Sequence, residues 1–257
     1  MVFYKYIKIF CLIIFCCQAS LAQNHTSLEI EGIKLYNEGL RLANEKIFDE
    51  SINSLNLSIE KFPSLMKAYF LKSRILGQLK RHEEAISTCN DALNIKKEQP
   101  LILSQKACSL YALQRYKESL KIAELAVKYG NNLSYTYVAR ANSNATLGNY
   151  KLAIEDYDRA LELVKDRNHN SLDETYLNRF CPLYSLKRYE EALATCDKAL
   201  EITDNAEKLP QIYSKKAAAL NKLGKYEEAL VYSDKALTVN SKDLLAIKEK
   251  KLARSKL

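Results

Sequence analysis

The sequence predicts an all-α fold, a right-handed solenoid of six helix pairs with one further helix at its end. The first observation behind this prediction is a regular series of anchor residues. The anchors are Phe48, His82, Tyr116, Tyr150, Tyr189 and Tyr226. The first four stand 34 residues apart, and the last two follow after 39 and 37 residues. Periods of this length indicate an array of small units, each of which buries its apolar face on the next.

The second observation is that the segments around the anchors resemble one another. Residues 187–193 read KRYEEAL, residues 224–230 read GKYEEAL, and residues 81–86 keep the pattern as RHEEAI. The acidic pairs directly after these three anchors open the second helices of their units, where carboxylates interact favourably with the helix dipole. We therefore interpret these pairs as structural.

The third observation is that small residues recur at fixed offsets from the anchors. Nine residues before the anchor stand Gly39, Ser73, Ala107, Ala141 and Ala217. Three residues after it stand Ser51, Ala85, Ser119, Ala153, Ala192 and Ala229. Ten residues after it stand Ser58, Ala92, Ala126, Ala160, Ala199 and Ala236. Small side chains at these places let two helix axes approach closely.

These positions resemble the tetratricopeptide repeat, a 34-residue pair of antiparallel helices. The resemblance covers about residues 32–243, and it implies that each first helix ends near its anchor and each second helix begins there. The tryptophan that the family often places in its first helix is absent throughout. The fifth repeat also departs from the pattern, because Phe180 occupies its small-residue position and Pro182 lies inside its first helix, where we expect a bend.

The chain divides into segments of different character. Residues 1–22 are predicted to be a signal peptide, 23–31 a flexible segment and 244–257 a capping helix. The six repeats are predicted at about 32–65, 66–99, 100–133, 134–167, 173–206 and 210–243. The last segment alternates leucine and isoleucine with lysine and arginine, and a solenoid needs such a polar-backed helix to cover its end. A basic amphipathic helix can also lie on an anionic membrane, but this position favours the cap.

The N-terminal residues indicate export. Lys5 and Lys8 precede an apolar run from Ile9 to Cys17, and Ser20-Leu21-Ala22 offers small residues for a signal peptidase. The run is too short for a permanent membrane anchor, which needs about 20 residues. We therefore predict a periplasmic or secreted protein with no stable membrane span. Cleavage of the signal peptide would remove Lys5 and Lys8 and lower the net charge of +8 by two. We interpret the remaining positive charge as favouring solubility rather than nucleic-acid binding.

No catalytic or metal-binding pattern is present in the sequence. The three histidines fall in the N-terminal tail, at one anchor and in a loop, and none forms a pair for metal or base chemistry. No glycine-rich phosphate loop occurs. We predict that the protein is not an enzyme and carries no cofactor or metal.

The cysteines of the mature chain are Cys89, Cys108, Cys181 and Cys196. Cys89 and Cys108 lie about equally far from one helix–helix turn, as Cys181 and Cys196 do from another. Their side chains should nevertheless diverge, so we predict four free thiols.

The resemblance implies a concave inner wall that is lined by the first helices and binds a protein or peptide partner. The residues predicted there are Tyr36, Phe70, Arg74, Tyr111, Tyr135, Val138, Asn142, Leu177 and Tyr184. Exposed apolar and aromatic residues of this kind mark interaction sites. The family's lysine and asparagine clamp for a C-terminal carboxylate is not matched, since Tyr36, Leu40, Phe70 and Arg74 stand where it would begin. Two functions remain open: an exported interaction scaffold or adaptor, and a chaperone-like or accessory subunit of a secretion or envelope-assembly complex.

Overall fold

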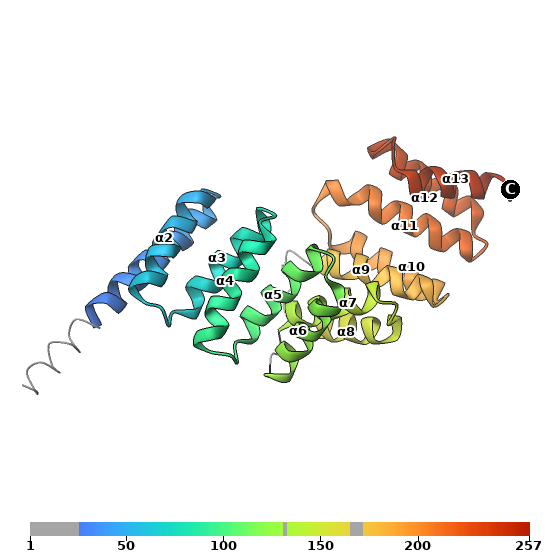
Figure 1. Cartoon of the computed structure of the whole chain (residues 1–257). Coiled ribbons are helices and arrows are strands. Elements are labelled where there is room, and N and C mark those ends of the chain that lie inside the picture. Colours follow the sequence, from blue (N-terminus) through green and yellow to red (C-terminus); the bar gives the residue numbers. More distant parts are fainter. Residues whose placement is uncertain (1–25, 131–132, 165–171) are drawn as a thin grey trace, which may run out of the picture. The chain divides into compact units, whose positions relative to one another are not determined.

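The computed structural model describes residues 26–130, 133–164 and 172–257, and these form helices and turns without a strand. The predicted signal peptide lies outside the described residues. The chain forms two compact units, of which unit 1 ends at Ser109 and unit 2 runs Leu110–Leu257. Antiparallel helix pairs stack in series within each unit (Figure 1). The predicted fold class, an all-α array of helix pairs, is confirmed.

Unit 1 contains an N-terminal helix over residues 26–44, followed by three complete helices and the larger part of a fourth. These are α2 (Phe48–Lys61), α3 (Met66–Gln78), α4 (His82–Ile95) and α5 (Pro100–Ala112). The flexible segment expected over 23–31 is instead helical from residue 26. This helix packs on α2 at Gly32, whose carbonyl oxygen accepts a hydrogen bond of 2.7 Å from Ser58 Oγ.

Unit 2 continues the same alternation to the end of the chain (Figure 1). Its helices are α6 (Tyr116–Lys128), α7 (Ser134–Thr146), α8 (Tyr150–Leu163), α9 (Leu172–Ser185), α10 (Tyr189–Ile202), α11 (Leu209–Lys222), α12 (Tyr226–Val239) and α13 (Leu244–Arg254). A short 3₁₀ turn, Ala206–Lys208, precedes α11. The helix pairs α7–α8, α9–α10 and α11–α12 make extensive contacts, and α13 packs on both α11 and α12.

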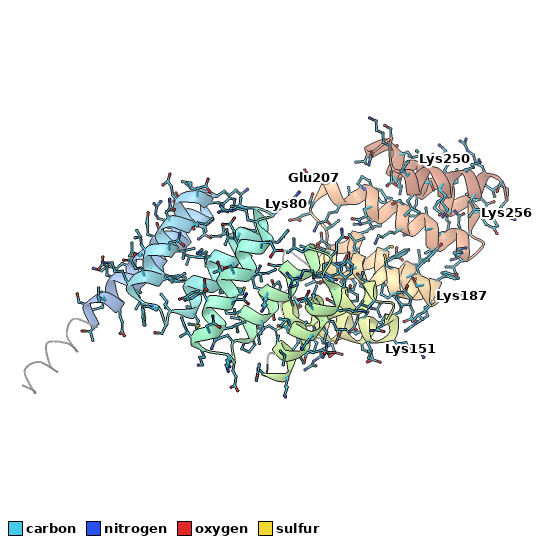
Figure 2. The ribbon with its side chains drawn as sticks, in the orientation of Figure 1. Lys80, Lys151, Lys187, Glu207, Lys250 and Lys256 are labelled. Atoms are coloured by element: carbon cyan, nitrogen blue, oxygen red, sulfur yellow. The ribbon has the colours of Figure 1, made fainter. Side chains whose placement is uncertain are left out.

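A left-handed residue stands two positions before every anchor. Four of these residues are not glycine, namely Lys46, Lys80, Gln114 and Lys187, with φ between 60° and 62°. Gly148 and Gly224 take the same role, and Figure 2 labels two of the lysines, Lys80 and Lys187. The backbone N–H of the following residue bonds to the carbonyl five residues earlier, as Arg81 does to Leu76 at 2.9 Å. This is the Schellman geometry that ends one helix and turns the chain into the next.

Small residues lie where helices approach most closely, as the sequence predicts. A Cβ added to Gly39 would stand 2.9 Å from Leu55 Cγ. Ser51 Oγ donates to the Gly39 carbonyl oxygen at 2.6 Å. In unit 2 the hydroxyls of Ser119 and Ser143 meet at 2.8 Å. The alanines predicted at these offsets in both units are fully buried.

The fifth repeat keeps its first helix despite its proline. α9 runs without interruption through Pro182 to Ser185, and Pro182 is itself buried. Phe180 is buried in a core cluster with Leu183 and with Ile212 of α11. The large side chain at the small-residue position is therefore absorbed into the core between α9 and α11.

All four cysteines of the described chain are free thiols, as predicted. Cys89 and Cys196 are buried, whereas Cys108 is half-buried and Cys181 is exposed. Burial raises the pKa of both core thiols to about 12, which keeps them protonated at neutral pH. They act as small apolar fillers of the core.

Candidate partner-binding wall

The predicted wall residues of unit 1 lie on two helices. Tyr36 of the N-terminal helix is half-buried against the cluster that contains Leu55 and Leu71. Phe70 of α3 is half-buried against a second cluster around Tyr69. Arg74 stands one turn after Phe70, is exposed, and holds its guanidinium carbon 5.9 Å from the Phe70 ring centre. Unit 1 therefore presents an arginine stacked on a half-buried aromatic ring.

The predicted wall of unit 2 begins with Tyr111 at the end of α5. Its ring lies 5.3 Å from the ring of the anchor Tyr116. Its hydroxyl lies 3.1 Å from Thr146 Oγ1 at the end of α7. Tyr111 is half-buried and therefore offers part of its ring to a ligand.

Asn142 of α7 connects three helices through one oxygen. Its Oδ1 accepts hydrogen bonds from the Tyr157 hydroxyl at 2.6 Å and from Asn178 Nδ2 at 3.4 Å. Tyr157 lies on α8, is 1% exposed and has its pKa raised by burial, so its hydroxyl remains a donor. Asn178 lies on α9 and is half-buried, like Asn142. Among the described residues, Asn142 Nδ2 and Asn178 Oδ1 have no partner, so one donor and one acceptor remain side by side.

Lys215 of α11 reaches back to α9. Its Nζ donates to the Leu177 carbonyl oxygen at 3.0 Å and lies 3.5 Å from Cys181 Sγ. It also lies 5.2 Å from the centre of the Phe180 ring. The side chain is buried at 9% exposure, and its contacts are with neutral groups. Lys215 therefore brings a positive charge close to the exposed thiol of Cys181.

Asn221 extends the same kind of contact to α13. Its Nδ2 donates to the carbonyl oxygen and to Oε2 of Glu249, both at 2.9 Å. We call Asn142, Asn178, Lys215 and Asn221 the polar line of unit 2. These residues belong to the first helices α7, α9 and α11, and their contacts tie each of these helices to the next.

Tyr184 lies on α9, the same helix as Asn178, and is part of a small aromatic group. Its ring stacks on Phe180 at 5.4 Å and meets the edge of Tyr189 at 5.2 Å. Burial, and next the Glu249 carboxylate, raise the pKa of Tyr184 to about 12. The half-buried hydroxyl therefore stays protonated at neutral pH and can donate to a ligand.

The remaining predicted wall residues differ from one another. Leu177 is 3% exposed and belongs to the core cluster with Phe180 and Leu183. Its side chain is therefore not accessible to a partner, because it is buried in the same core cluster as the bulky Phe180. Tyr135 is exposed and Val138 is half-buried on α7, so both keep accessible surface.

Several residues of the wall were not found from the sequence. Tyr157 stands seven residues after its anchor, the offset at which Cys89 and Cys196 are buried. The hydroxyl of a tyrosine buried at that offset needs a hydrogen-bond partner. A tyrosine there therefore indicates a nearby polar residue, and Asn142 of the same repeat is that residue. Lys215 has no comparable signal, since lysine is usually exposed and its partner is a backbone carbonyl.

The described residues contain no group of three or more histidine, cysteine, aspartate or glutamate side chains that could hold a metal ion. Within the same residues, no helix is both long and apolar enough to cross a membrane. What the wall offers is a line of amides, aromatic rings and one lysine. Such groups suit hydrogen bonding and apolar contact with a ligand.

The model of the tetratricopeptide repeat family matches residues 67–99, 134–166 and 210–243. These three segments match the tetratricopeptide repeat, as the sequence pattern indicates. Dynein axonemal assembly factor 4 of Pongo pygmaeus is 30% identical over 123 residues, which are 47% of this chain and 29% of that protein. A DnaJ homolog subfamily C member 7 homolog of Schizosaccharomyces pombe is 28% identical over 189 residues, 67% of this chain and 39% of that protein. The chain thus spans well under half the length of these relatives.

Solved structures share the fold at low sequence identity. Pseudomonas aeruginosa pilF superposes with a TM-score of 0.72 at 14% identity, covering 90% of this chain and 100% of that chain. PilW, described as a type IV pilus biogenesis factor, gives 0.70 at 14% identity, covering 84% and 97%. YrrB, described as a TPR protein with an unusual peptide-binding site, gives 0.61 at 19% identity, covering 77% and 97%. At these identities the likeness shows the fold alone.

Proposed function

We propose that this chain is a non-catalytic interaction scaffold that holds a segment of a partner polypeptide on the wall of unit 2. Tetratricopeptide repeat proteins are protein-interaction scaffolds, and the wall supplies the chemistry for such binding. The observation that carries the proposal is the half-buried amide pair of Asn142 and Asn178, whose Nδ2 and Oδ1 atoms have no partner among the described residues. One donor and one acceptor, held in place by Tyr157, match the carbonyl and N–H of a peptide backbone.

The aromatic residues of the wall provide the apolar part of the contact. Tyr111 and Tyr184 are half-buried, so a partner would gain ring contact without the cost of ordering a free side chain. In unit 1, Tyr36, Phe70 and Arg74 form a second surface of the same kind. Tyrosine, phenylalanine and arginine bury a large area with few rotatable bonds, and tyrosine and arginine in particular are enriched where binding energy concentrates.

We further propose that the protein acts outside the cytoplasm. The support is the sequence of residues 1–22, with Lys5 and Lys8 before the apolar run and small residues at Ser20 and Ala22. The measurement is N-terminal sequencing of the protein recovered from the periplasm or medium of cells that make it. A chain beginning at Gln23 supports export, and retention of Met1 in the cytoplasm contradicts it.

The alternative is an accessory subunit of an assembly or secretion complex. Its support is that similar proteins carry names of this kind, an assembly factor and a pilus biogenesis factor. A scaffold should recover one partner in stoichiometric amount from a pull-down with the purified chain. An assembly factor that acts transiently should recover many clients in small amounts.

The same pull-down tests the wall itself through matched variants. Tyr111→Ala should weaken partner capture by about 2 kcal/mol, roughly thirtyfold, if it is a hot spot, and Phe70→Ala should do the same if the second surface, on unit 1, also binds the partner. Asn178→Ala should weaken it as well, because it removes the acceptor of the amide pair. The control is Lys151→Ala on the outer face of α8 (Figure 2). The proposal is wrong if Lys151→Ala abolishes capture while the wall variants, still folded by circular dichroism, leave it unchanged.

A further inference from the structure

Exposed apolar side chains are concentrated at the first and last helices of the chain. Five of the sixteen large hydrophobic residues that are exposed in the described part lie there, and Leu257 follows just after α13. The five are Leu28, Ile30, Ile33, Leu244 and Ile247. Single exposed hydrophobic residues are ordinary, whereas a cluster on one helix face marks an interaction surface.

On α13, the exposed residues share one face. Leu244, Ile247, Lys248 and Lys251 follow the spacing i, i+3, i+4 and i+7, which places them together. We call them the tail face. Leu244 is 81% exposed. The opposite face of α13 is buried against unit 2 through its alanines and Glu249, so the tail face points away from the helices that α13 covers.

The charge of the tail face is largely uncompensated. Lys248 approaches only Glu249, at 3.7 Å, and Lys251 has no ion-pair partner within the described chain. The neighbouring Lys250 differs, because it pairs with Asp234 of α12. Lys250 and Lys256 are seen on this helix and just beyond it in Figure 2. The tail face thus combines two aliphatic side chains with two available ammonium groups.

The N-terminal helix carries a face of the opposite charge. Glu29, Ile30 and Ile33 are all exposed and lie within one turn, at i, i+1 and i+4. We call them the head face. Glu29 has no ion-pair partner in the part of the chain that the structure describes. Glu31 of the same helix pairs with Lys61 at 3.7 Å, and the exposed Lys34 follows Ile33, so Glu29 is the one acidic group that the head face itself offers.

We propose that the tail face of one copy of this chain binds the head face of a second copy. Leucine and isoleucine meet isoleucine, and the lysines meet Glu29, so the two faces match in both hydrophobicity and charge. Contact between two tail faces would bring like charges together, which disfavours it. A head-to-tail contact leaves one free face at each end and therefore adds further copies. The surface is small, so the association should be reversible and depend on concentration.

Sedimentation velocity of the purified chain over a range of concentrations tests this contact. The average mass should rise with concentration and fall with added salt, because the charges are exposed. Leu244→Ser/Ile247→Ser should weaken self-association by roughly tenfold or more through lost apolar contact. Lys248→Glu/Lys251→Glu should weaken it to a similar degree, and so should Glu29→Lys, through like charges. The variant that combines Glu29→Lys with Lys248→Glu/Lys251→Glu should recover association, because the charges are exchanged.

The matched control is Lys96→Glu/Lys97→Glu, which makes the same charge change on the exposed residues after α4. It should leave self-association unchanged, and circular dichroism should show that every variant keeps its helix content. The proposal fails if the chain is monomeric throughout or if the combined variant stays dissociated. It also fails if the chain is monomeric and Lys248→Glu/Lys251→Glu only removes binding to phosphatidylserine vesicles. That result would make the tail face a membrane contact.

Discussion

The two units of the chain hold neighbouring helices together by different chemistry. In unit 1, serine hydroxyls donate to backbone carbonyls across the helix pair, as Ser51 does to Gly39 and Ser58 to Gly32. The ion pairs between its helices are long, at 3.7 Å for Lys61 with Glu31 and 3.9 Å for Arg81 with Asp49. Unit 1 therefore depends on close approach of backbones.

In unit 2, side chains of opposite charge join helices at closer range. Arg140 binds Asp156 through two hydrogen bonds of 2.9 and 2.5 Å. Arg179 binds Asp158 at 2.7 Å. Three further pairs are Lys208 with Asp173, Lys216 with Asp197, and Lys250 with Asp234. Unit 1 should therefore be sensitive to added volume, and unit 2 to the loss of a charge.

The largest expected effect is at Asp156, which is 4% exposed between α7 and α8. Asp156→Ala should lower the stability of unit 2 by about 3 kcal/mol, because it leaves Arg140 without its partner. The Asn144 amide also loses the carboxylate to which it donates at 3.3 Å. Urea unfolding combined with hydrogen exchange of α7 and α8 measures the loss.

Two variants serve as controls for this prediction. Arg140→Met/Asp156→Leu should recover most of the lost stability, because apolar residues can replace a buried pair. Asp158→Ala should cost less than about 1 kcal/mol, because the Asp158 side chain is 46% exposed. Equal losses at Asp156 and Asp158 would contradict a role for burial.

A smaller effect is expected from Gly32→Ala in unit 1. An added Cβ would stand 2.6 Å from Phe62 Cβ and 3.2 Å from the Phe62 backbone nitrogen. Overpacking of this kind costs about 1–3 kcal/mol, and alanine's better helix propensity returns about 1 kcal/mol. We expect a net loss of about 1–2 kcal/mol, seen by hydrogen exchange in α2.

The matched control is Gly77→Ala in α3. Its added Cβ would meet only Gln105 Nε2, at 3.0 Å, and the end of a flexible side chain can move. This variant should be neutral or slightly stabilising. If Gly32→Ala behaves like Gly77→Ala, close backbone approach is not what holds the N-terminal helix to α2.

Much of the fold could be predicted from the sequence, because the repeat imposes the same packing demands at each period. Small residues had to stand where helices meet, and the side chains of the four cysteines were expected to diverge. Leu177 shows where this reasoning fails. Its offset predicts the wall, but Phe180 in place of a small residue turns this side of α9 into the core.

The polar contacts of unit 2 were also beyond the sequence pattern. Lys215 bonds to a backbone carbonyl, and Asn221 bonds to Glu249 on a different helix pair. Such partners depend on how repeats stack, which no single repeat reveals. Two charged pairs of unit 2 do follow the repeat, because Arg179 and Lys216 stand ten residues before their anchors while their partners Asp158 and Asp197 stand eight residues after the preceding anchors. Asp156, which stands six residues after its anchor, has no acidic counterpart in another repeat.

A pH effect of about 1 kcal/mol is expected at Asp173. Burial alone would raise the pKa of this carboxyl, but the hydrogen bonds from Lys208, Thr203 and the Glu174 backbone N–H outweigh burial and lower it. The folded pKa thus lies below the unfolded value of about 3.9. The stabilisation is therefore complete above the unfolded pKa and is lost as pH falls through the folded pKa.

Comparison of Asp173→Asn with the parent from pH 7 to pH 3 measures this contribution. The parent should be more stable at pH 7, and the difference should shrink as the pH falls below about 4. Chemical unfolding at each pH, followed by hydrogen exchange of α9, gives the two stabilities. A difference that stays constant down to pH 3 would show that the charge of Asp173 is not what matters.

The smallest effects are expected at ion pairs that occur in both units. Arg81, Arg115 and Arg188 each pair with the glutamate three residues later, and all of these side chains are at least 40% exposed. The Arg188 hydrogen bond lowers the pKa of Glu191, but solvent screens an exposed pair. Arg188→Gln should therefore change stability by less than about 0.5 kcal/mol, and Arg81→Gln should leave the thermal midpoint of unit 1 unchanged. Because the same kind of ion pair occurs in unit 1 and in unit 2, it cannot explain why the stability of unit 2 should depend more on a single charge than that of unit 1. A clear loss on Arg188→Gln, as large as that on Asp156→Ala, would mean that exposed charges stabilise unit 2 and that burial of Asp156 is not the cause.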